Sequence, residues 1–401
     1  MSVNKGRAGA SSPAMGLGGA WAMAVGGMIG GGIFSTLGVV ISVAGQWAWI
    51  SFLIGGLVAL ASGHSYAVLT TRFEKSGGSY AYLMETGWPR VARAVAWTLV
   101  IGYTLTISVY AETFGAYAAY AIGAPHWVTK AAAILAIVVL LGVNLRGASE
   151  ATSLEIFVVW GKLVILLGLA GLGIYHWAPD NLHFDQEHPV GIGEAFIGMG
   201  VVFMAYEGFQ LLSYDYNEMR DPSRTISRAM PLAIIVTTIT YMVVAVGAGM
   251  LAGASNIVAE KEVSLALAGR QALGSFGFIA VSIAAVFSAG SAINATIFAT
   301  ARLAEGAAQD GNMPKLFAKR DTRNVPWFGV SIISAGAILL VLMGEIASLV
   351  EGASFVFLLI FALVNFIALS LKVRRRWISV LGLLGSIAGA VMLVLYQIGV
   401  V

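Results

Sequence analysis

The chain contains no cysteine, and charged residues make up only 11% of its 401 residues. The lack of cysteine excludes disulfide bonds, thiolate catalysis and cysteine-ligated metal sites. The charged fraction is less than half of the roughly 25% that is usual in soluble domains. The sequence also lacks a phosphate-binding P-loop, an HExxH zinc motif and a GxSxG nucleophile motif. It therefore shows no sign of a nucleotide-hydrolysing or proteolytic site, and we expect no enzyme.

Hydrophobic residues, in contrast, make up 58% of the chain, and the mean hydropathy is +0.85. Apolar runs long enough to cross a bilayer as helices, about 20 residues each, recur along the whole sequence. They lie at residues 15–43, 46–71, 92–121, 127–145, 153–177, 191–214, 229–252, 273–303, 326–344, 347–371 and 377–399. The pattern predicts an all-α integral membrane protein with about 11 transmembrane helices.

Basic residues are concentrated in alternate connections between these runs. If the N-terminal tail, residues 1–13, is cytoplasmic, all 23 Lys and Arg residues lie in inner connections except Lys130, Lys162, Lys261 and Arg270. This asymmetry follows the positive-inside rule and predicts a cytoplasmic N-terminus. Because the net charge is only +3, we interpret the basic residues as topology signals and expect no binding of nucleic acid.

The first apolar run contains a glycine-rich interruption at mid-membrane depth, Gly26–Phe34, with the sequence GGMIGGGIF. Each glycine costs roughly 1 kcal/mol relative to alanine in a helix, so local unwinding is cheap here. Irregular backbone survives at this depth only where protein buries it or a cavity wets it. Unwinding would leave amides free to hold a ligand. The alternative is helix packing, because the glycines are also spaced as GxxxG pairs.

A second interruption lies in the sixth run, where Gly198–Phe209 places Glu207 and Gly208 at mid-membrane depth. Glycine-interrupted segments at corresponding positions of two halves are typical of inverted-repeat transporters, whose half-helix ends face the substrate. The N-terminal end of a half-helix suits a carboxylate, and exposed carbonyls suit an ammonium group. Since an amino acid carries both groups, the two interruptions together favour a substrate site over helix packing.

Four separated motifs resemble those of the amino acid-polyamine-organocation transporter family. Ile29–Phe34 (IGGGIF) is similar to its first-helix signature IG(S/G)GIF, and Phe203–Phe209 (FMAYEGF) is similar to its sixth-helix pattern FxAYEGF. Asn217–Ala229 resembles its E(x)xxP(x)RxxPxA loop, and Ser288–Pro314 resembles its eighth helix with the cytoplasmic segment that follows. The resemblance covers nearly the whole chain.

The resemblance implies a leucine-transporter-like core of two inverted five-helix repeats, with discontinuous first and sixth helices, in the cell membrane. After the tail at 1–13, residues 14–177 would form the first repeat and 191–371 the second, followed by an additional helix at 377–401. The chain departs from the family at Ser227, where the loop motif usually has proline. It also has one span fewer than many members. The missing last helix should leave the transport core complete, and we expect it to affect oligomer contacts instead.

Lys162 lies about ten residues into the fifth run, and an ionisable residue at such depth is a functional-site hypothesis by default. Burial disfavours the ammonium form, so such a lysine can gain and lose a proton. In proton-linked relatives, a fifth-helix lysine looks like a replacement for the sodium ion of sodium-coupled transporters. The resemblance implies that the ammonium meets first-helix carbonyls near Gly26 and eighth-helix hydroxyls such as Ser288 or Ser291. The alternative is a lysine that snorkels to the inner interface.

Glu207 stands in the proposed sixth-helix interruption, beside Gly208. Its carboxylate can accept hydrogen bonds from freed amides, bind a substrate ammonium group or carry a coupled proton. The alternative is a structural glutamate that ties two half-helices together. Nothing in the sequence separates these roles.

Two other polar residues stand inside predicted spans. Glu112 faces either a cavity, together with Tyr110 and Tyr117, or a neighbouring helix through a hydrogen bond. His64 is more typical of a packing residue than of a ligand, because no second histidine or carboxylate stands at ligand spacing. We therefore expect no metal site, no cofactor and no catalytic residue.

The leading hypothesis is a secondary transporter that moves amino acids by proton-coupled alternating access around the two broken helices. Backbone amides of the first interruption would hold the substrate carboxylate, and carbonyls of the second would hold its ammonium group. The residues predicted at the substrate site are Ile29, Gly30, Gly31, Gly32, Phe203, Met204, Ala205, Tyr206, Glu207 and Gly208. The residues predicted to couple protons are Lys162 and Glu207.

A polyamine or cationic amino acid carrier or exchanger is the alternative within transport, because Glu207 and Glu112 can both bind cationic nitrogen. A channel or a membrane receptor would use the same spans without stoichiometric coupling. An intramembrane enzyme is the weakest option, because the membrane carboxylates and His64 form no paired constellation. The expected partners are a small-molecule substrate, protons and the lipid bilayer, and the substrate's identity and the oligomeric state stay open.

Overall fold

The computed structural model describes residues 15–125, 127–147, 152–183 and 190–400, apart from the side chains of 152–155. The predicted N-terminal tail, residues 1–13, lies outside this part of the chain. The helices are α1 (Leu17–Ala44), α2 (Ala48–Phe73), α3 (Gly78–Glu85), α4 (Pro89–Ala121), α5 (Trp127–Leu145), α6 (Thr152–His176), α7 (Glu194–Val202), α8 (Pro222–Ala252), α9 (Ala254–Ala259), α10 (Ser264–Gln309), α11 (Trp327–Met343), α12 (Ile346–Ser370) and α13 (Arg376–Gln397).

The apolar helices correspond to the predicted spans. In the described chain, eight stretches are long and apolar enough to cross a membrane, and the first of them, Leu17–Phe73, contains both α1 and α2. Two shorter apolar helices, Glu194–Tyr206 and α11, complete the set. The all-α membrane fold is confirmed, whereas the division of the chain into two inverted repeats stays a prediction.

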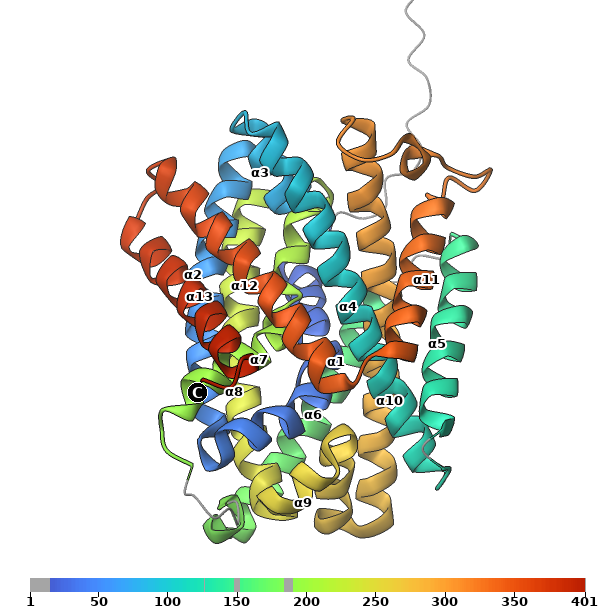
Figure 1. Cartoon of the computed structure of the whole chain (residues 1–401), viewed down its shortest axis with the longest axis vertical. Helices are drawn as coiled ribbons and strands as arrows, with labels where there is room; N and C mark the ends of the chain where they lie inside the picture. Colours follow the sequence, from blue (N-terminus) through green and yellow to red (C-terminus); the bar gives the residue numbers. More distant parts are fainter. Residues whose placement is uncertain (1–14, 126, 148–151, 184–189, 401) are drawn as a thin grey trace, which may run out of the picture.

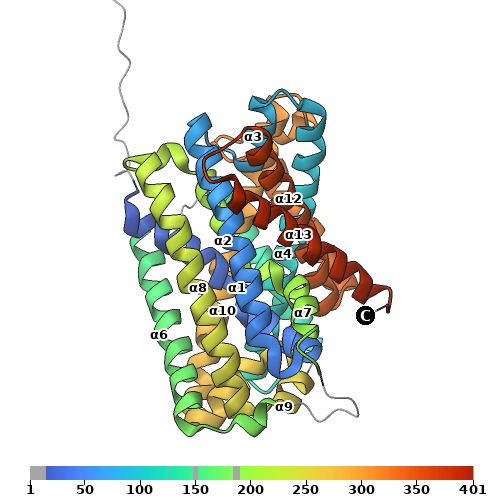
Figure 2. The same ribbon diagram turned by 90° about the vertical axis from the view of Figure 1, so that its left-hand side faces the viewer.

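The core of the bundle is α1, which packs against α8, α10, α7 and α6. Every residue of α1 from Met28 to Ile41 is buried. Figure 1 shows α2 and α13 along one side of the molecule and α5 and α11 along the other. Figure 2, turned by 90°, shows α6 and α8 together on the side opposite α13. A helix that protein surrounds in this way has no face left for lipid.

The predicted discontinuity of the first helix is wrong, because α1 is one α-helix throughout Leu17–Ala44. The glycines of this helix instead leave room for close neighbours. A Cβ atom at Gly30 would lie 2.6 Å from the Ala292 side chain, and one at Gly31 would lie 1.9 Å from the Tyr110 ring. The structure therefore agrees with the alternative, in which these glycines allow close helix packing.

The predicted interruption of the sixth span is confirmed. Helix α7 ends at Val202, and two short 3-10 segments, η3 (Phe203–Tyr206) and η4 (Phe209–Ser213), follow it. Between them Glu207 is extended, and Gly208 has φ = 135°, a conformation that favours glycine. The chain therefore leaves the α-helical path in the middle of the span.

The eighth span begins where the sequence predicts it. Within α10, Leu273 and Gly274 have non-helical dihedral angles, with φ = 61° at Gly274. The preceding turns from Ser264 fold back so closely that a Cβ atom at Gly277 would lie 2.1 Å from the Gly269 carbonyl oxygen. The spanning part of α10 thus starts near residue 275, close to the predicted 273.

The last helix, α13, is held to α2 and α12 by a buried polar cluster. The Ser65 hydroxyl donates to Asn365 Oδ1 at 2.7 Å and lies 2.8 Å from the Ser379 hydroxyl, while Asn365 Nδ2 donates to the Ser62 hydroxyl at 2.9 Å. Close contacts extend this interface, since a Cβ atom at Gly382 would lie 2.5 Å from Asn365 Oδ1. This face of α13 is therefore used within the chain.

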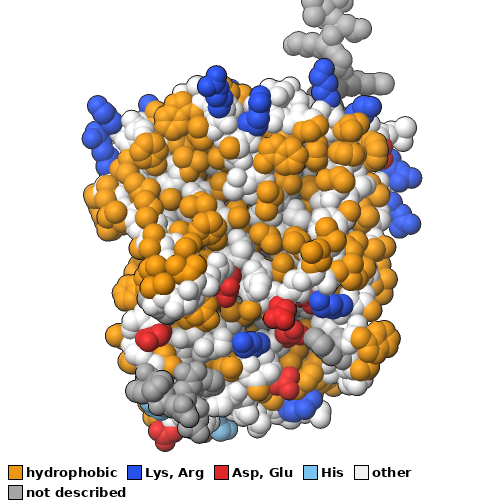
Figure 3. Space-filling view, in the orientation of Figure 1, with side chains coloured by type: hydrophobic (Ala, Val, Ile, Leu, Met, Phe, Trp, Pro, Cys, Tyr) orange, Lys and Arg blue, Asp and Glu red, His pale blue; other side chains and the backbone are white. Residues whose placement is uncertain are grey.

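The surface has the zones of a membrane protein. In Figure 3, hydrophobic side chains cover most of the visible face, and Lys and Arg side chains gather along the upper edge, the end that carries α3 in Figure 1. Most of the visible acidic side chains lie in the lower half. We call the α3 end the basic end of the molecule.

Alanine variants of two serines of α13 test whether the polar cluster stabilises the protein. Ser379→Ala removes the bond to Ser65 and should lower the free energy of unfolding by about 1 kcal/mol. Ser386→Ala should be neutral or slightly stabilising, because the buried Ser386 hydroxyl has no hydrogen-bond partner among the described residues. Thermal unfolding midpoints in one detergent measure both effects, and equal midpoints for the two variants would contradict the role of the cluster.

Candidate functional site

The interrupted sixth span meets α1 at a contact between two glycines. A Cβ atom at Gly208 would lie 2.6 Å from the backbone carbon of Gly27, and one at Gly27 would lie 3.1 Å from Gly208 Cα. Neither position accepts a side chain without movement of the backbone. The two segments that the sequence paired as a site are thus in direct main-chain contact.

Tyr241 of α8 joins the same two segments through its hydroxyl. The hydroxyl lies 2.6 Å from the Met28 carbonyl oxygen and 2.9 Å from that of Ala205. It has one proton and so donates fully to only one carbonyl at a time. A side chain from a third helix therefore links α1 to η3 by a bond that can shift between them. The sequence gives no local signal for this residue, which stands in an ordinary apolar run.

The amide freed at the end of α7 is satisfied by α12. The Met204 N–H donates to the Ser354 hydroxyl at 2.9 Å, and this hydroxyl in turn donates to the Val201 carbonyl at 2.6 Å. Ser354 thus replaces a lost helical hydrogen bond at membrane depth, where an unpaired amide is costly. It is a second residue that sequence reasoning missed.

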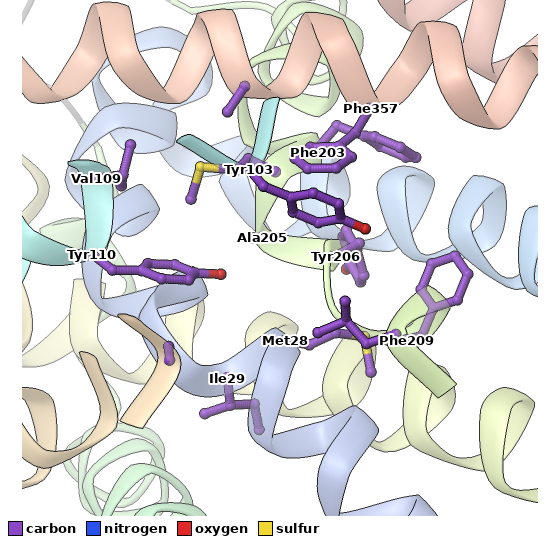
Figure 4. Packing of buried hydrophobic residues seen from close by; sticks show 14 of the residues in the cluster. Met28, Ile29, Tyr103, Val109, Tyr110, Phe203, Ala205, Tyr206, Phe209 and Phe357 are labelled. Carbon is purple, nitrogen blue, oxygen red and sulfur yellow. The ribbon is translucent and has the colours of Figure 1, made fainter. Parts of the chain in front are cut away.

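Glu207 lies inside a hydrogen-bond network, with 1% of its surface exposed. Its carboxylate accepts bonds from the Tyr110 hydroxyl at 3.2 Å and from Gln210 Nε2 at 3.1 Å. The same Gln210 accepts the Gly208 N–H at 2.9 Å through Oε1, and its Nε2 lies 3.3 Å from the Tyr103 hydroxyl. Figure 4 shows Tyr103 and Tyr110 extending from α4 toward this segment. The contacts match the structural alternative, a glutamate that ties the interruption together.

Lys162 of α6 reaches α1 as the resemblance implied. Its Nζ donates to the Gly26 carbonyl oxygen at 3.4 Å, and only 4% of the residue is exposed, so it does not snorkel. One turn along α1, the Ser288 hydroxyl of α10 donates to the Ile29 carbonyl at 3.1 Å. Side chains of α6, α8 and α10 thus all bond carbonyls in the same stretch of α1. A role of Lys162 in proton coupling stays a prediction.

A cavity of about 660 Å³ leads from this region to the basic end. Its inner end is lined by Gly26 and Gly27 of α1, and its mouth by Tyr80 and Glu85 of α3 and by Asp310. None of the ten residues predicted at the substrate site lines it, and neither does Lys162. Ile29 to Gly32 and Phe203 to Gly208 are buried just beyond its inner end.

An ion-pair cluster stands at the cavity mouth. Arg302 of α10 lies 3.6 Å from an Asp215 carboxylate oxygen and 3.5 Å from one of Glu218. Burial, with a smaller contribution from Glu218, raises the pKa of Asp215 to about 6, while Arg302 acts to lower it. Next to it, Met15 exchanges two backbone hydrogen bonds of 2.9 Å with Glu218 and Arg220. The start of α1 is thereby tied to the loop that follows the interrupted span.

The other polar residues named from the sequence lie apart from this cavity. Glu112 is 4% exposed, lines no part of the cavity, and its Oε1 has no hydrogen-bond partner among the described residues. Glu112 therefore does not face this cavity, whereas its hydrogen bond to a neighbouring helix stays a prediction, because the missing partner concerns Oε1 alone. His64 Nε2 lies 3.3 Å from the Arg374 carbonyl oxygen, a packing contact. Within the described chain, no group of three or more His, Asp or Glu side chains could hold a metal ion.

A family model for amino acid permeases matches residues 16–401. The chain belongs to the amino acid permease family. This permease is 30% identical over 360 residues to the inner membrane transport protein YbaT of Escherichia coli, and the aligned region covers 87% of this chain and 81% of YbaT. It is 25% identical over 362 residues to the serine/threonine exchanger SteT of Bacillus subtilis, covering 88% of this chain and 82% of SteT. It is 27% identical over 354 residues to the methylthioribose transporter of Bacillus subtilis, covering 82% and 75%.

Family and helices together establish a multi-pass membrane transporter, as the sequence predicts. Among the residues of this permease that the structure describes, the contact of α1 with the interrupted sixth span is the one place where irregular backbone, a buried lysine and a large cavity come together. We call this place, comprising Gly26 to Gly32 and Phe203 to Gly208, the junction.

Tyr241→Phe tests the hydroxyl that links the two halves of the junction. The ring would keep its packing against Phe52 and Tyr206, whose centroids lie 5.3 Å and 5.5 Å away. Loss of the hydroxyl leaves a buried carbonyl unpaired, which should lower the free energy of unfolding by about 1–3 kcal/mol. The thermal midpoint of the purified protein should fall and substrate exchange should slow.

Tyr175→Phe is the matched control, because Tyr175 is 84% exposed whereas Tyr241 is buried. It should change neither measurement. If both tyrosine variants behave like the parent protein, the hydroxyl of Tyr241 does not hold the junction.

Proposed function

We propose that the protein is a proton-coupled secondary transporter of amino acids that works by alternating access around the junction. The observation that carries this proposal is the junction itself, at the inner end of a cavity that reaches one surface of the membrane protein. The family description and the name of the serine/threonine exchanger support amino acids as the substrate class.

The open cavity corresponds to an inward-facing state in this proposal. It opens at the basic end, and the positive-inside rule makes the basic end cytoplasmic. On the opposite side α1 is closed by the loop segment η6 (Lys261–Val263), since a Cβ atom at Gly38 would lie 2.5 Å from the Lys261 carbonyl oxygen. An edge-to-face contact between Phe34 and Tyr117, with centroids 5.9 Å apart, closes the same path nearer the junction.

Substrate binding in this scheme uses both sides of the junction. The carbonyls of η3 suit an ammonium group. On the α1 side, Gly26 and Gly27 line the inner end of the cavity, and Ile29 to Gly32 would contact the substrate beyond them. The bond between Tyr241 and the Met28 carbonyl would be exchanged for contacts with the substrate.

Lys162 is the proposed proton carrier. As an ammonium it donates to the Gly26 carbonyl and holds α1 against α6. After losing its proton, a neutral amine donates more weakly to a carbonyl, so this part of α1 is less firmly held. Protonation from one side and release to the other would therefore couple proton movement to the position of α1.

A polyamine substrate is less well supported. Glu207 already accepts bonds from Tyr110 and Gln210 and does not line the cavity. The inner end of the cavity, around Gly26 and Gly27, carries no carboxylate among its described lining residues. No group positioned there would pair with a second cationic nitrogen.

Proteoliposomes test both the substrate and the coupling. Wild-type protein should catalyse saturable amino acid counterflow, and an acidic exterior should drive accumulation. One proton per substrate allows about tenfold accumulation per pH unit. Lys162→Gln should retain counterflow. It should abolish accumulation driven by the pH gradient, because it removes the group that gains and loses the proton.

Lys130→Gln is the control lysine variant, since Lys130 lies on α5 and its Nζ bonds the Gly344 carbonyl at 3.3 Å. It should accumulate substrate like the wild type. Competition by putrescine or methylthioribose without competition by any neutral amino acid would overturn the proposed substrate class. Full accumulation by Lys162→Gln would overturn its proposed role.

A further inference from the structure

The wall of the cavity changes in chemistry along α10. Ser291, Asn294 and Arg302 all line it, and a rise of 1.5 Å per residue places Arg302 about 12 Å nearer the mouth than Asn294. The charged lining residues are found toward the mouth: Lys75, Glu85, Asp215, Arg302 and Asp310. Between them and the junction, the lining residues that the structure describes are neutral.

Two asparagines form the polar part of this neutral wall. Asn144 of α5 and Asn294 of α10 both line the cavity, and Asn144 Nδ2 donates to Asn294 Oδ1 at 2.7 Å. Asn144 Nδ2 also donates to the Leu140 carbonyl oxygen at 2.9 Å. Both amide protons of Asn144 are therefore used, and the backbone carbonyl fixes the direction in which the amide points.

The remaining polar atom of Asn144 is its Oδ1. The residue is 2% exposed, and Oδ1 accepts no hydrogen bond from any described residue. This oxygen is not fully buried, and because Asn144 lines the cavity, it is accessible from the cavity. A carbonyl oxygen held in this way accepts a hydrogen bond from a neutral donor such as a hydroxyl or an amide. It offers nothing to an alkyl group.

We infer that Asn144 selects, among neutral amino acids, those whose side chain donates a hydrogen bond. This inference rests on the proposed function and names the substrate class of the same cavity. Asn144 Oδ1 accepts the bond from the substrate side chain, and Asn294 positions Asn144. A substrate with an alkyl side chain of the same shape leaves Oδ1 dehydrated and unpaired, and sites built on such a bond reject the analogue that lacks the donor.

Isosteric substrate pairs isolate this hydrogen bond. Counterflow in proteoliposomes is measured for threonine against valine and for asparagine against leucine, as kcat/KM for each. Wild-type protein should prefer threonine over valine and asparagine over leucine by about tenfold each, the usual effect of one hydrogen bond. Asn144→Leu should reduce both ratios to near one while valine transport continues.

Asn144→Thr guards against loss of folding in the leucine variant. Threonine hydroxyls elsewhere in this chain donate to the carbonyl four residues earlier, as Thr104 does to Val100 at 2.6 Å. The introduced threonine would make the same local bond to Leu140, but its only side-chain oxygen stands one bond nearer the backbone than the amide Oδ1 and would not occupy the same position in the cavity. The donor preference of this variant should therefore also disappear.

Asn365→Leu is the matched control. Asn365 is a buried asparagine whose Nδ2 also donates to the carbonyl four residues earlier, that of Phe361, at 2.8 Å, but it lies in the α13 interface. This variant should lower the thermal midpoint and leave both substrate ratios unchanged.

The outcomes separate the two proposals. Absence of counterflow with every amino acid overturns the proposed function. Counterflow without donor preference in the wild type, or with a preference that survives in Asn144→Leu and Asn144→Thr, overturns the inference and leaves the proposed function standing. Loss of the preference in Asn365→Leu as well would show that the ratios follow general stability, and it would overturn the role of Asn144.

Discussion

Every backbone amide and carbonyl at membrane depth needs a partner inside the protein, and this requirement governs the junction. Where the sixth span leaves the α-helical path, side chains supply the missing bonds. Ser354 satisfies the amide of Met204, Gln210 that of Gly208, and Tyr241 reaches the carbonyl of Ala205. Because those partners come from α12, η4 and α8, movement of any of these elements changes the stability of the interrupted segment.

The spans and the interrupted sixth helix could be predicted from the residues themselves, and the contact of Lys162 with Gly26 from the family resemblance. Hydropathy is a long-range average that tolerates local error, and a glutamate followed by glycine is costly in an unbroken helix at membrane depth. The prediction for α1 failed because glycines that permit unwinding also permit close packing, and only the neighbours decide. At Gly31 the neighbour is the Tyr110 ring.

The residues that sequence reasoning missed share one property. Tyr241 and Ser354 each act through an atom whose partner is far away in the chain, and Asn144 is positioned by Asn294, which is equally distant in sequence. No local pattern marks them, because a tyrosine, serine or asparagine in an apolar run is compatible with many environments. Gln210 was closer to detection, since it stands three residues after Glu207 in a segment already expected to be irregular.

The central claim is that substrate reaches the junction through the cavity from the basic end. The absence of natural cysteine makes a direct measurement possible with Ala295→Cys, which lines the cavity, and Ser223→Cys, which lies outside it at the basic end. A membrane-impermeant maleimide should label both from the cytoplasmic side, and a transported amino acid should slow labelling at position 295 alone, in a saturable way. Labelling of position 295 only from the opposite side, or labelling that no transported amino acid slows, would contradict the claim.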